Sequence, residues 1–214
     1  MVRTGGTNVS ADATGWSLQD VTNSMEAAKA TLVPYVLDAR ASRFTVQTFA
    51  TGLLSAVGHN PTIGVRDFSG EVSFSQEALQ GSGFRLSLKT TSLSVQDDIS
   101  DKDHREIERL MNEQILETAK YPEAVYEAPV LSITRLGESL YSAVLDGNLT
   151  FRGVTCKQPV AARIAVFGTV LRASGNFTLR QTDYQIKLIS IAGGALKLKD
   201  ELKFSFEMVA REQE

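Results

Sequence analysis

The feature that most constrains this chain is an alternation of apolar and polar residues that recurs from residue 40 to the C-terminus. Successive side chains of a β-strand point to opposite faces, so a period of two is typical of strands with one buried and one solvated face. The clearest case is residues 201–208, where Leu, Phe, Phe and Met alternate with Glu, Lys, Ser and Glu. The same pattern occurs at residues 43–47, 67–74, 84–89, 141–145, 160–166 and 177–179. These segments predict a mainly β fold built from antiparallel strands.

Tripeptides that contain glycine separate the predicted strands. They are Gly81-Ser82-Gly83, Leu136-Gly137-Glu138, Asp146-Gly147-Asn148 and Ala192-Gly193-Gly194. Such residues favour turns, and many short amphipathic strands with short connections are typical of a β-barrel or a β-sandwich. With 214 residues, of which 43% are hydrophobic, the chain suits one soluble domain of this kind with a short extension.

One segment breaks the alternation and has helical spacing instead. Residues 100–118 can be capped by Ser100 or Asp101, carry acidic residues in the first turn and are followed by Tyr121-Pro122, which ends a helix. The apolar residues that share one face are Ile107, Leu110, Met111 and Ile115. We therefore expect an amphipathic helix that can cover an open end of the barrel.

The N-terminal part of the chain has a different character. Residues 1–16 are rich in Gly, Thr, Ser, Asn and Ala and predict a flexible leader, and residues 17–32 have the spacing of a short amphipathic helix that ends before Pro34. We therefore divide the chain into a leader with a short helix at 1–35 and a barrel domain at 36–214. The helix packs on its own domain in the simplest reading, and closing a pore or meeting a second subunit in a homodimer are the alternatives.

Charge and cysteine content limit the function classes. A formal net charge of -3 provides no broad basic field for nucleic acid or an anionic membrane surface, so we expect no nucleic-acid partner. A single cysteine, Cys156, excludes an intramolecular disulfide and a thiolate cluster for metal. No stretch approaches the ~20 apolar residues of a membrane span, and none resembles a signal peptide. The sequence as written therefore indicates a cytoplasmic protein, or a periplasmic one if a signal peptide was removed.

The apolar faces of the predicted strands are rich in Phe, Leu and Val and almost free of charge. An eight-stranded barrel is wide enough either to be filled by side chains or to hold one small ligand, and alternation alone does not choose between these two interiors. The candidate lining residues are Phe44, Val46, Phe68, Val72, Phe74, Phe84, Leu86, Leu88, Phe177, Phe204 and Phe206.

Five segments, in order, resemble the YceI-like proteins. They are SRFTVQTFATG, LKTTSLSVQDD, LDGNLTFRGVTCKQPV, ASGNFTLRQTDY and LKLKDELKFSF, and the resemblance extends over about residues 36–210. The third segment is the most specific, although it carries an extra residue before Pro159, and Tyr184-Gln185 stands where the family has Phe-Gly.

The resemblance implies an extended, lipocalin-like antiparallel β-barrel whose lumen holds a long amphiphile. It implies a carrier that binds, sequesters or transports an isoprenoid, an isoprenoid quinone or a fatty-acid type of ligand, with no covalent chemistry and no other cofactor. Two other readings remain open. The chain could be an enzyme that acts on an apolar substrate with His59 as acid or base, or a filled barrel whose helices bind a protein partner.

The polar candidates near strand ends are His59 and Asn60, which precede Pro61. His59 suits either a hydrogen bond to a ligand head group or a structural role. A metal site would need further ligands, and His104 beside Asp101 and Asp103 matches no compact metal motif, so we expect no metal site. Since the chain has no Gly-x-Ser-x-Gly motif, we assign no catalytic residue.

Arg152 and Arg180 occupy positions that match arginines of the family. Each can pair with a carboxylate, such as Asp146 or Asp183, in a structural clamp, or contact an anionic head group. We favour the clamp, because a buried arginine without a partner is costly.

Overall fold

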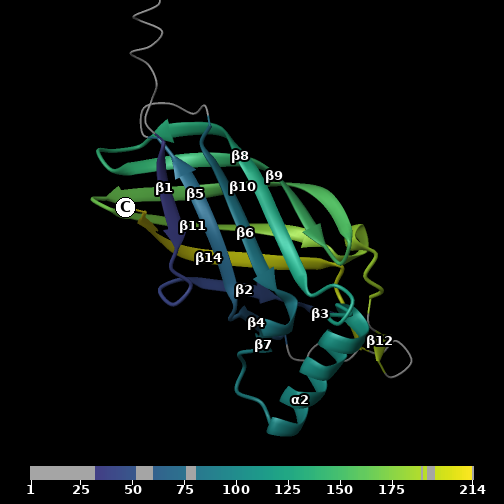
Figure 1. Ribbon diagram of the computed structural model, residues 1–214. Helices are drawn as coiled ribbons and strands as arrows, with labels where there is room; N and C mark the ends of the chain where they lie inside the picture. Colours follow the sequence, from purple (N-terminus) through teal and green to yellow (C-terminus); the bar gives the residue numbers. More distant parts are fainter. Residues whose placement is uncertain (1–31, 52–59, 76–80, 189, 192–195, 214) are drawn as a thin grey trace, which may run out of the picture. The chain divides into compact units, whose positions relative to one another are not determined.

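Eight antiparallel strands form a closed barrel in this computed structural model, which describes residues 32–51, 60–75, 81–188, 190–191 and 196–213 (Figure 1). Around the ring they are β1 (Val33–Leu37), β5 (Phe68–Phe74), β6 (Gly83–Lys89), β8 (Glu123–Arg135), β9 (Leu140–Phe151), β10 (Val154–Phe167), β11 (Val170–Arg180) and β14 (Glu201–Glu212). β14 pairs with β1 and closes the ring. The mainly β, antiparallel barrel predicted from the alternation is confirmed.

Shorter elements extend the barrel wall. β2 (Arg43–Gln47), β4 (Thr62–Val65) and β7 (Leu93–Val95) continue the sheet from β14, which is long enough to pair with both β1 and β2. A small second sheet contains β12 (Ser190–Ile191), β13 (Leu196–Leu198) and β3 (Ala50–Thr51). The described helical elements are η1 (Thr90–Ser92), α2 (Asp101–Leu110), its continuation η2 (Met111–Ile115) and η3 (Gln181–Tyr184).

The barrel begins earlier than the sequence division at residue 36. The chain separates into two units between Thr31 and Leu32, and residues 33–35 belong to β1 rather than to the leader. Tyr35 is 4% exposed and lies opposite Val72 of β5. Pro34 marks the end of the helical pattern in the sequence, but a proline is also tolerated near the start of a strand. It therefore did not show that β1 had already begun. The predicted leader at 1–16 and helix at 17–32 lie outside the described residues, except for Leu32.

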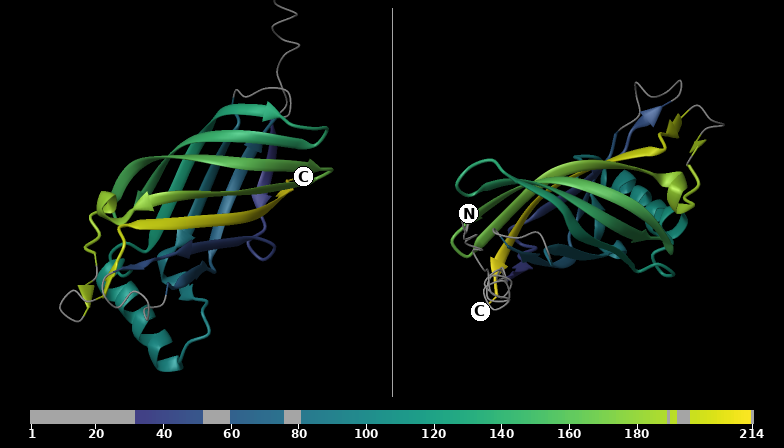
Figure 2. Two further views of the ribbon diagram at one scale, coloured as in Figure 1. Left: turned by 180° about the vertical axis from the view of Figure 1, so that it is seen from behind. Right: turned by 90° about the horizontal axis from the view of Figure 1, so that it is seen from above.

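The two ends of the barrel differ in what surrounds them. At one end, here called the helix end, lie α2, η2 and η3 together with the β9–β10 turn. At the other, here called the hairpin end, lie residues 131–140 and 163–172, which contain the β8–β9 and β10–β11 turns. These two turns project side by side in both opposite views (Figures 1 and 2). The N–H of Val166 donates to the carbonyl of Ser139 at 2.9 Å and joins them.

The predicted turn at Asp146-Gly147-Asn148 is wrong, because β9 runs through all three residues. A Cβ atom at Gly147 would overlap the ring of Tyr126, which crosses the strand there. The glycine therefore provides room for an aromatic side chain inside the barrel rather than a change of chain direction.

The tight turn that follows β9 lies instead at Arg152-Gly153. Both residues have positive φ, 49° for Arg152 and 74° for Gly153, which is typical of a two-residue hairpin turn. The sequence phrase around them therefore encodes a hairpin, and this hairpin carries Arg152 to the helix end.

Candidate ligand cavity

An apolar cavity of about 390 Å³ lies inside the barrel. Its volume is within the range of ligand-binding pockets, roughly 300–1,000 Å³. The lining side chains come from the strands of the ring, from the extension β2-β4-β7 and from the α2–η2 helix, and none of the described lining residues is charged. Sequence alternation left open whether the barrel is filled or hollow, and the structure shows a hollow one.

The predicted lining residues can now be placed one by one. Those whose side chains line the cavity are Phe44, Val46, Val72, Phe74, Phe84, Leu86, Leu88, Phe177, Phe204 and Phe206. Phe68 is the exception, because it is buried in the apolar core without lining the cavity. It is the first residue of β5, directly after the β4–β5 turn, where neighbouring side chains cover it. Contact of any of these residues with a ligand stays a prediction.

Aromatic rings form one wall of the cavity. The Phe204 ring stacks on Phe177 with centroids 4.7 Å apart and contacts Phe44 at 5.9 Å. These residues come from β14, β11 and β2, so the wall depends on the pairing of three adjacent strands. Aromatic rings bury large apolar areas, which gives this wall a strong preference for hydrocarbon.

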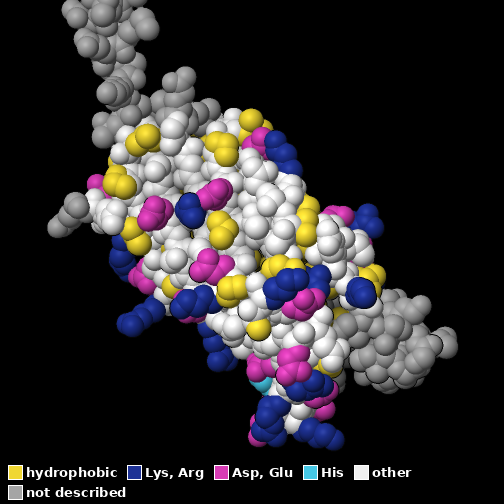
Figure 3. Space-filling view, turned by 45° about the vertical axis from the view of Figure 1, so that its right-hand side comes forward, with side chains coloured by type: hydrophobic (Ala, Val, Ile, Leu, Met, Phe, Trp, Pro, Cys, Tyr) yellow, Lys and Arg dark blue, Asp and Glu magenta, His cyan; other side chains and the backbone are white. Residues whose placement is uncertain are grey.

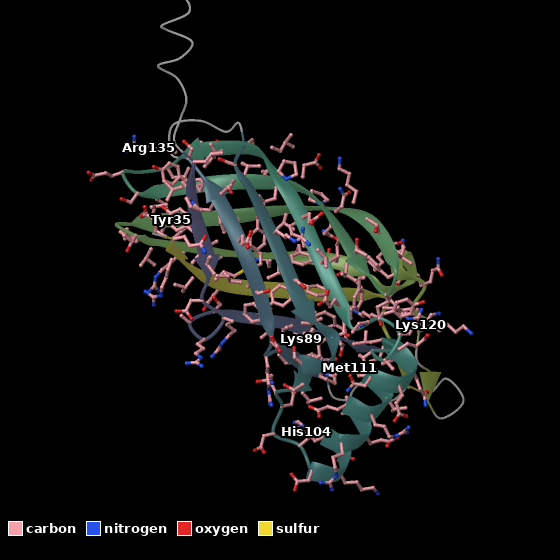
Figure 4. All side chains as sticks on the ribbon, viewed as in Figure 1. Tyr35, Lys89, His104, Met111, Lys120 and Arg135 are labelled. Atoms are coloured by element: carbon pink, nitrogen blue, oxygen red, sulfur yellow. The ribbon has the colours of Figure 1, made fainter. Side chains whose placement is uncertain are left out.

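The α2–η2 helix supplies the part of the lining that covers the helix end. Ser100 caps it as predicted, since its hydroxyl accepts a hydrogen bond from Asp103 N–H at 3.2 Å. The residues of the helix and its end that line the cavity are Ile107, Leu110, Met111, Ile115 and Leu116. Figure 4 shows Met111 beside the barrel and His104 farther out on the same helix. The helix ends in one π-helical turn, in which Leu116 N–H donates to Met111 O at 2.9 Å.

The polar side chains in the lining are uncharged: Thr48, Ser73, Tyr126 and Gln181. The Tyr126 hydroxyl donates to the Gln158 carbonyl at 3.0 Å, and burial raises its pKa, with a further contribution from the charge of Asp146. The Gln181 amide donates to the Lys199 carbonyl at 2.8 Å. The Thr48 hydroxyl donates to the Pro61 carbonyl at 3.4 Å. Three of these groups therefore already have partners, and the lining offers hydrogen-bonding atoms without a formal charge.

Arg152 lies at the helix end and joins three parts of the chain. Its guanidinium forms an ion pair with Glu117, which follows η2, and donates to the Gln185 carbonyl after η3 at 2.7 Å. It also lies over the Tyr121 ring at 5.8 Å. Its side chain is only 15% exposed. The clamp interpretation is therefore supported, with Glu117 as the carboxylate in place of the Asp146 or Asp183 that we had expected.

We expect Arg152→Met to lower the melting temperature by about 4–8 °C. Loss of the guanidinium leaves the partly buried Glu117 without its counter-ion, at a cost of ~2 kcal/mol, and ~1 kcal/mol corresponds to about 2–4 °C in a chain of this size. Methionine is also unbranched, so the positive φ is no less favourable than before. Thermal unfolding followed by circular dichroism checks this, and an unchanged melting temperature would refute the clamp. The double variant with Glu117→Gln should lose less than the sum of the two single variants.

Arg180 lies on the outside of the barrel, with its side chain 68% exposed. It pairs with Asp200 at 2.9 Å rather than with Asp146 or Asp183. Burial alone would raise the pKa of Asp200, but hydrogen bonds from the N–H and hydroxyl of Thr182 and from Arg180 lower it below its ordinary value. This placement favours the clamp over a head-group contact in the lumen.

The remaining polar candidates are peripheral or undescribed. His59 lies outside the described residues, so its proposed roles as head-group contact or acid–base group stay predictions. Asn60 is exposed and precedes Pro61, which lines the cavity. His104 is partly exposed on α2, 3.5 Å from Glu108. Within the described ranges, no three His, Cys, Asp or Glu side chains are grouped so that they could hold a metal ion.

Some cavity residues were not among the sequence candidates. Tyr126 precedes Glu127 on β8 and Leu145 precedes Asp146 on β9, so a period of two could have identified them, although each follows a valine that weakens the pattern. Gln181 had no such signal, because it follows Arg180 in a polar segment. It is only 5% exposed because η3 turns it toward the barrel interior.

Cys156 is partly buried on β10, and its thiol lies 3.5 Å from the carbonyl of Asp183.

Comparisons with known proteins agree with this architecture. A model of the YceI-like domain matches residues 35–210. A polyisoprenoid binding domain from Saccharophagus degradans, implicated in plant cell wall breakdown, is 16% identical with a TM-score of 0.62, covering 86% of this chain and 100% of that one. BcnA of Burkholderia cenocepacia is 16% identical with a TM-score of 0.60, covering 81% and 98%.

The YceI protein of Campylobacter jejuni is also 16% identical, with a TM-score of 0.53 and coverage of 73% and 88%. No curated protein matches the sequence. In the described part of the chain, no helix is both long and apolar enough to cross a membrane.

Proposed function

Because this chain belongs to the YceI-like family, we propose that it binds a long, uncharged apolar amphiphile in the barrel cavity and carries or sequesters it without covalent chemistry. The observation that carries this proposal is the apolar cavity, whose described lining contains no charge. The polyisoprenoid binding of the Saccharophagus domain favours an isoprenoid chain as the cargo.

The apolar lining supplies enough free energy for tight binding. A ligand of about forty heavy atoms at roughly 0.3 kcal/mol per atom gains about 12 kcal/mol, which corresponds to a nanomolar dissociation constant. Hydrocarbon contacts alone account for this, so no catalytic group is needed for a carrier.

Native mass spectrometry of the freshly purified full-length protein tests the proposal. We expect one long-chain molecule per protein, which organic extraction releases. When this molecule is bound again and extracted a second time, its mass should be unchanged. A protein that arrives bare and takes up neither prenyl nor acyl probes would refute the proposal. Recovery of a chemically altered probe would instead support the enzyme reading.

The uncharged lining also predicts which head groups enter the cavity. We expect a fatty alcohol to bind at least about tenfold more tightly than the fatty acid of the same chain length at pH 8. An ionised carboxylate inside the cavity would lose its hydration without meeting a counter-charge, at a cost of several kcal/mol. Displacement of a fluorescent fatty probe measures both affinities.

The pH dependence provides the control for this comparison. Bound carboxylic acid has a raised pKa, so its affinity should increase as the pH falls and the neutral form becomes populated, whereas the affinity of the alcohol should not change. Equal affinities at pH 8 would show that a charged head group finds a cation or stays in water at the cavity mouth. This result would overturn the preference for an uncharged cargo but not cargo binding itself.

A further inference from the structure

Four apolar side chains project into solvent at the hairpin end, the end of the barrel opposite the α2 helix. They are Leu131, 63% exposed, Phe167, 62%, Leu136, 53%, and Leu140, 41%. Leu131 is the extra residue of a β-bulge in β8, and Leu136 and Phe167 lie at the two hairpin turns joined by the Val166–Ser139 hydrogen bond. In Figure 3, hydrophobic side chains reach the surface at the upper end, whereas charged side chains crowd the α2 helix below.

Arginines accompany these apolar side chains. Residues 131–140 and 163–172 contain Arg135, Arg163 and Arg172, and their single carboxylate is Glu138. Glu212 at the end of β14 adds a second carboxylate, because its N–H donates to the Thr169 carbonyl in the β10–β11 turn, and the neighbouring Arg211 is paired with Asp38. The hairpin end therefore has three arginines against two carboxylates, a local excess of positive charge, although the whole chain has a net charge of -3. The expectation from the net charge concerned a broad basic field, and it does not exclude a local cluster of arginines.

None of these three arginines forms an ion pair among the described residues. Arg135 donates to the carbonyls of Gly137 and Glu138, both at 3.0 Å, and Figure 4 shows Arg135 at the end away from Met111. Arg163 and Arg172 are exposed. Arg172 lies opposite Ala165, next to Leu140 and Phe167 on the outer face.

We propose that the hairpin end docks on a lipid bilayer that contains anionic lipids. Leu136 and Phe167 would insert at the boundary between head groups and acyl chains, while the arginines contact the lipid phosphates. A second copy of the chain fits less well, because a stable protein interface needs about 800 Å² per partner and two projecting hairpin turns offer little flat area. This surface is outside the barrel, so the proposal does not depend on what the cavity holds.

Flotation of the full-length protein with vesicles tests this inference. We expect the protein to float with phosphatidylcholine vesicles that contain phosphatidylglycerol and to bind pure phosphatidylcholine at least about tenfold more weakly. Each arginine near an anionic surface contributes about a fivefold factor in the partition coefficient, so the double variant Arg163→Gln/Arg172→Gln should lose about thirtyfold. High salt should have a similar effect on the wild type because it screens these charges.

The apolar contribution is tested with Leu136→Ser/Phe167→Ser, for which we expect a loss of at least about tenfold. Two matched controls lie at the other end of the barrel. Leu188→Ser changes an apolar residue that is 42% exposed, and Lys102→Gln/Arg105→Gln on α2 removes two positive charges. Both controls should float like the wild type.

Three results would overturn the docking proposal. The wild type could fail to bind anionic vesicles, or the hairpin-end variants could bind as well as the controls, which would place the contact elsewhere in the chain. Sedimentation velocity could also show a dimer that Leu136→Ser/Phe167→Ser converts to a monomer, which would identify a second copy as the occupant.

Discussion

Phe204→Asp is expected to lower the melting temperature by about 10–20 °C and to abolish ligand uptake. Phe204 is 9% exposed, lines the cavity and stacks on Phe177. The variant loses the transfer free energy of a phenyl ring and buries a carboxyl group among uncharged residues, at a combined cost of ~5 kcal/mol. At about 2–4 °C per kcal/mol, this produces the stated shift, which thermal unfolding measures.

The neighbouring Lys203→Asp is the matched control. Lys203 is exposed on the outer face of the same strand, so the same new side chain should change the melting temperature by less than about 2 °C and leave uptake intact. Equal effects of the two variants would mean that the faces of β14 are assigned the wrong way round. Phe204→Leu should retain the fold, which separates the effect of charge from the effect of lost volume.

The sequence was sufficient to predict the parts of the fold that depend on the spacing of neighbouring residues along the chain. A period of two identifies a strand and its buried face without knowledge of its partners, and the inward faces of β2, β5, β6, β11 and β14 were predicted in this way. Ser100 and the apolar stripe after it identified α2 by the same local reasoning. Phe68 shows the limit, because burial on an inward face does not decide whether a side chain reaches the cavity.

Contacts between distant segments were not predictable in the same way. The partners of Arg152, which are Glu117 and Gln185, lie more than thirty residues away on either side, and no local pattern selects them from the other acidic and carbonyl groups. Gly147 was predicted to lie in a turn. A glycine is needed there because a side chain would overlap the ring of Tyr126, which belongs to another strand and is therefore not evident from the local sequence. The local excess of positive charge at the hairpin end also appears only when β8, β10 and β11 bring Arg135, Arg163 and Arg172 together.

Filling the cavity separates binding from folding, which Phe204→Asp cannot do. We expect Ala162→Trp to weaken ligand binding by at least about a hundredfold while the barrel stays folded. Ala162 is 6% exposed, lines the cavity and lies opposite Ala143 on β9, so an indole would occupy space that the ligand needs. Displacing about ten ligand atoms at roughly 0.3 kcal/mol each costs about 3 kcal/mol, which is more than a hundredfold in the dissociation constant.

The adjacent Ala161→Trp provides the control, because Ala161 is exposed on the outer face of β10. Overpacking a filled core costs about 1–3 kcal/mol. The cost should be smaller for Ala162→Trp, because the cavity has room for the indole. We therefore expect the melting temperature of this variant to fall by no more than about 10 °C. Ala162→Leu, with a smaller side chain, should give an intermediate affinity. Titration of a fluorescent prenyl probe measures all three variants. If Ala162→Trp bound the probe as tightly as Ala161→Trp, the cargo would lie outside the cavity, and the carrier proposal would have to be abandoned even though the fold stands.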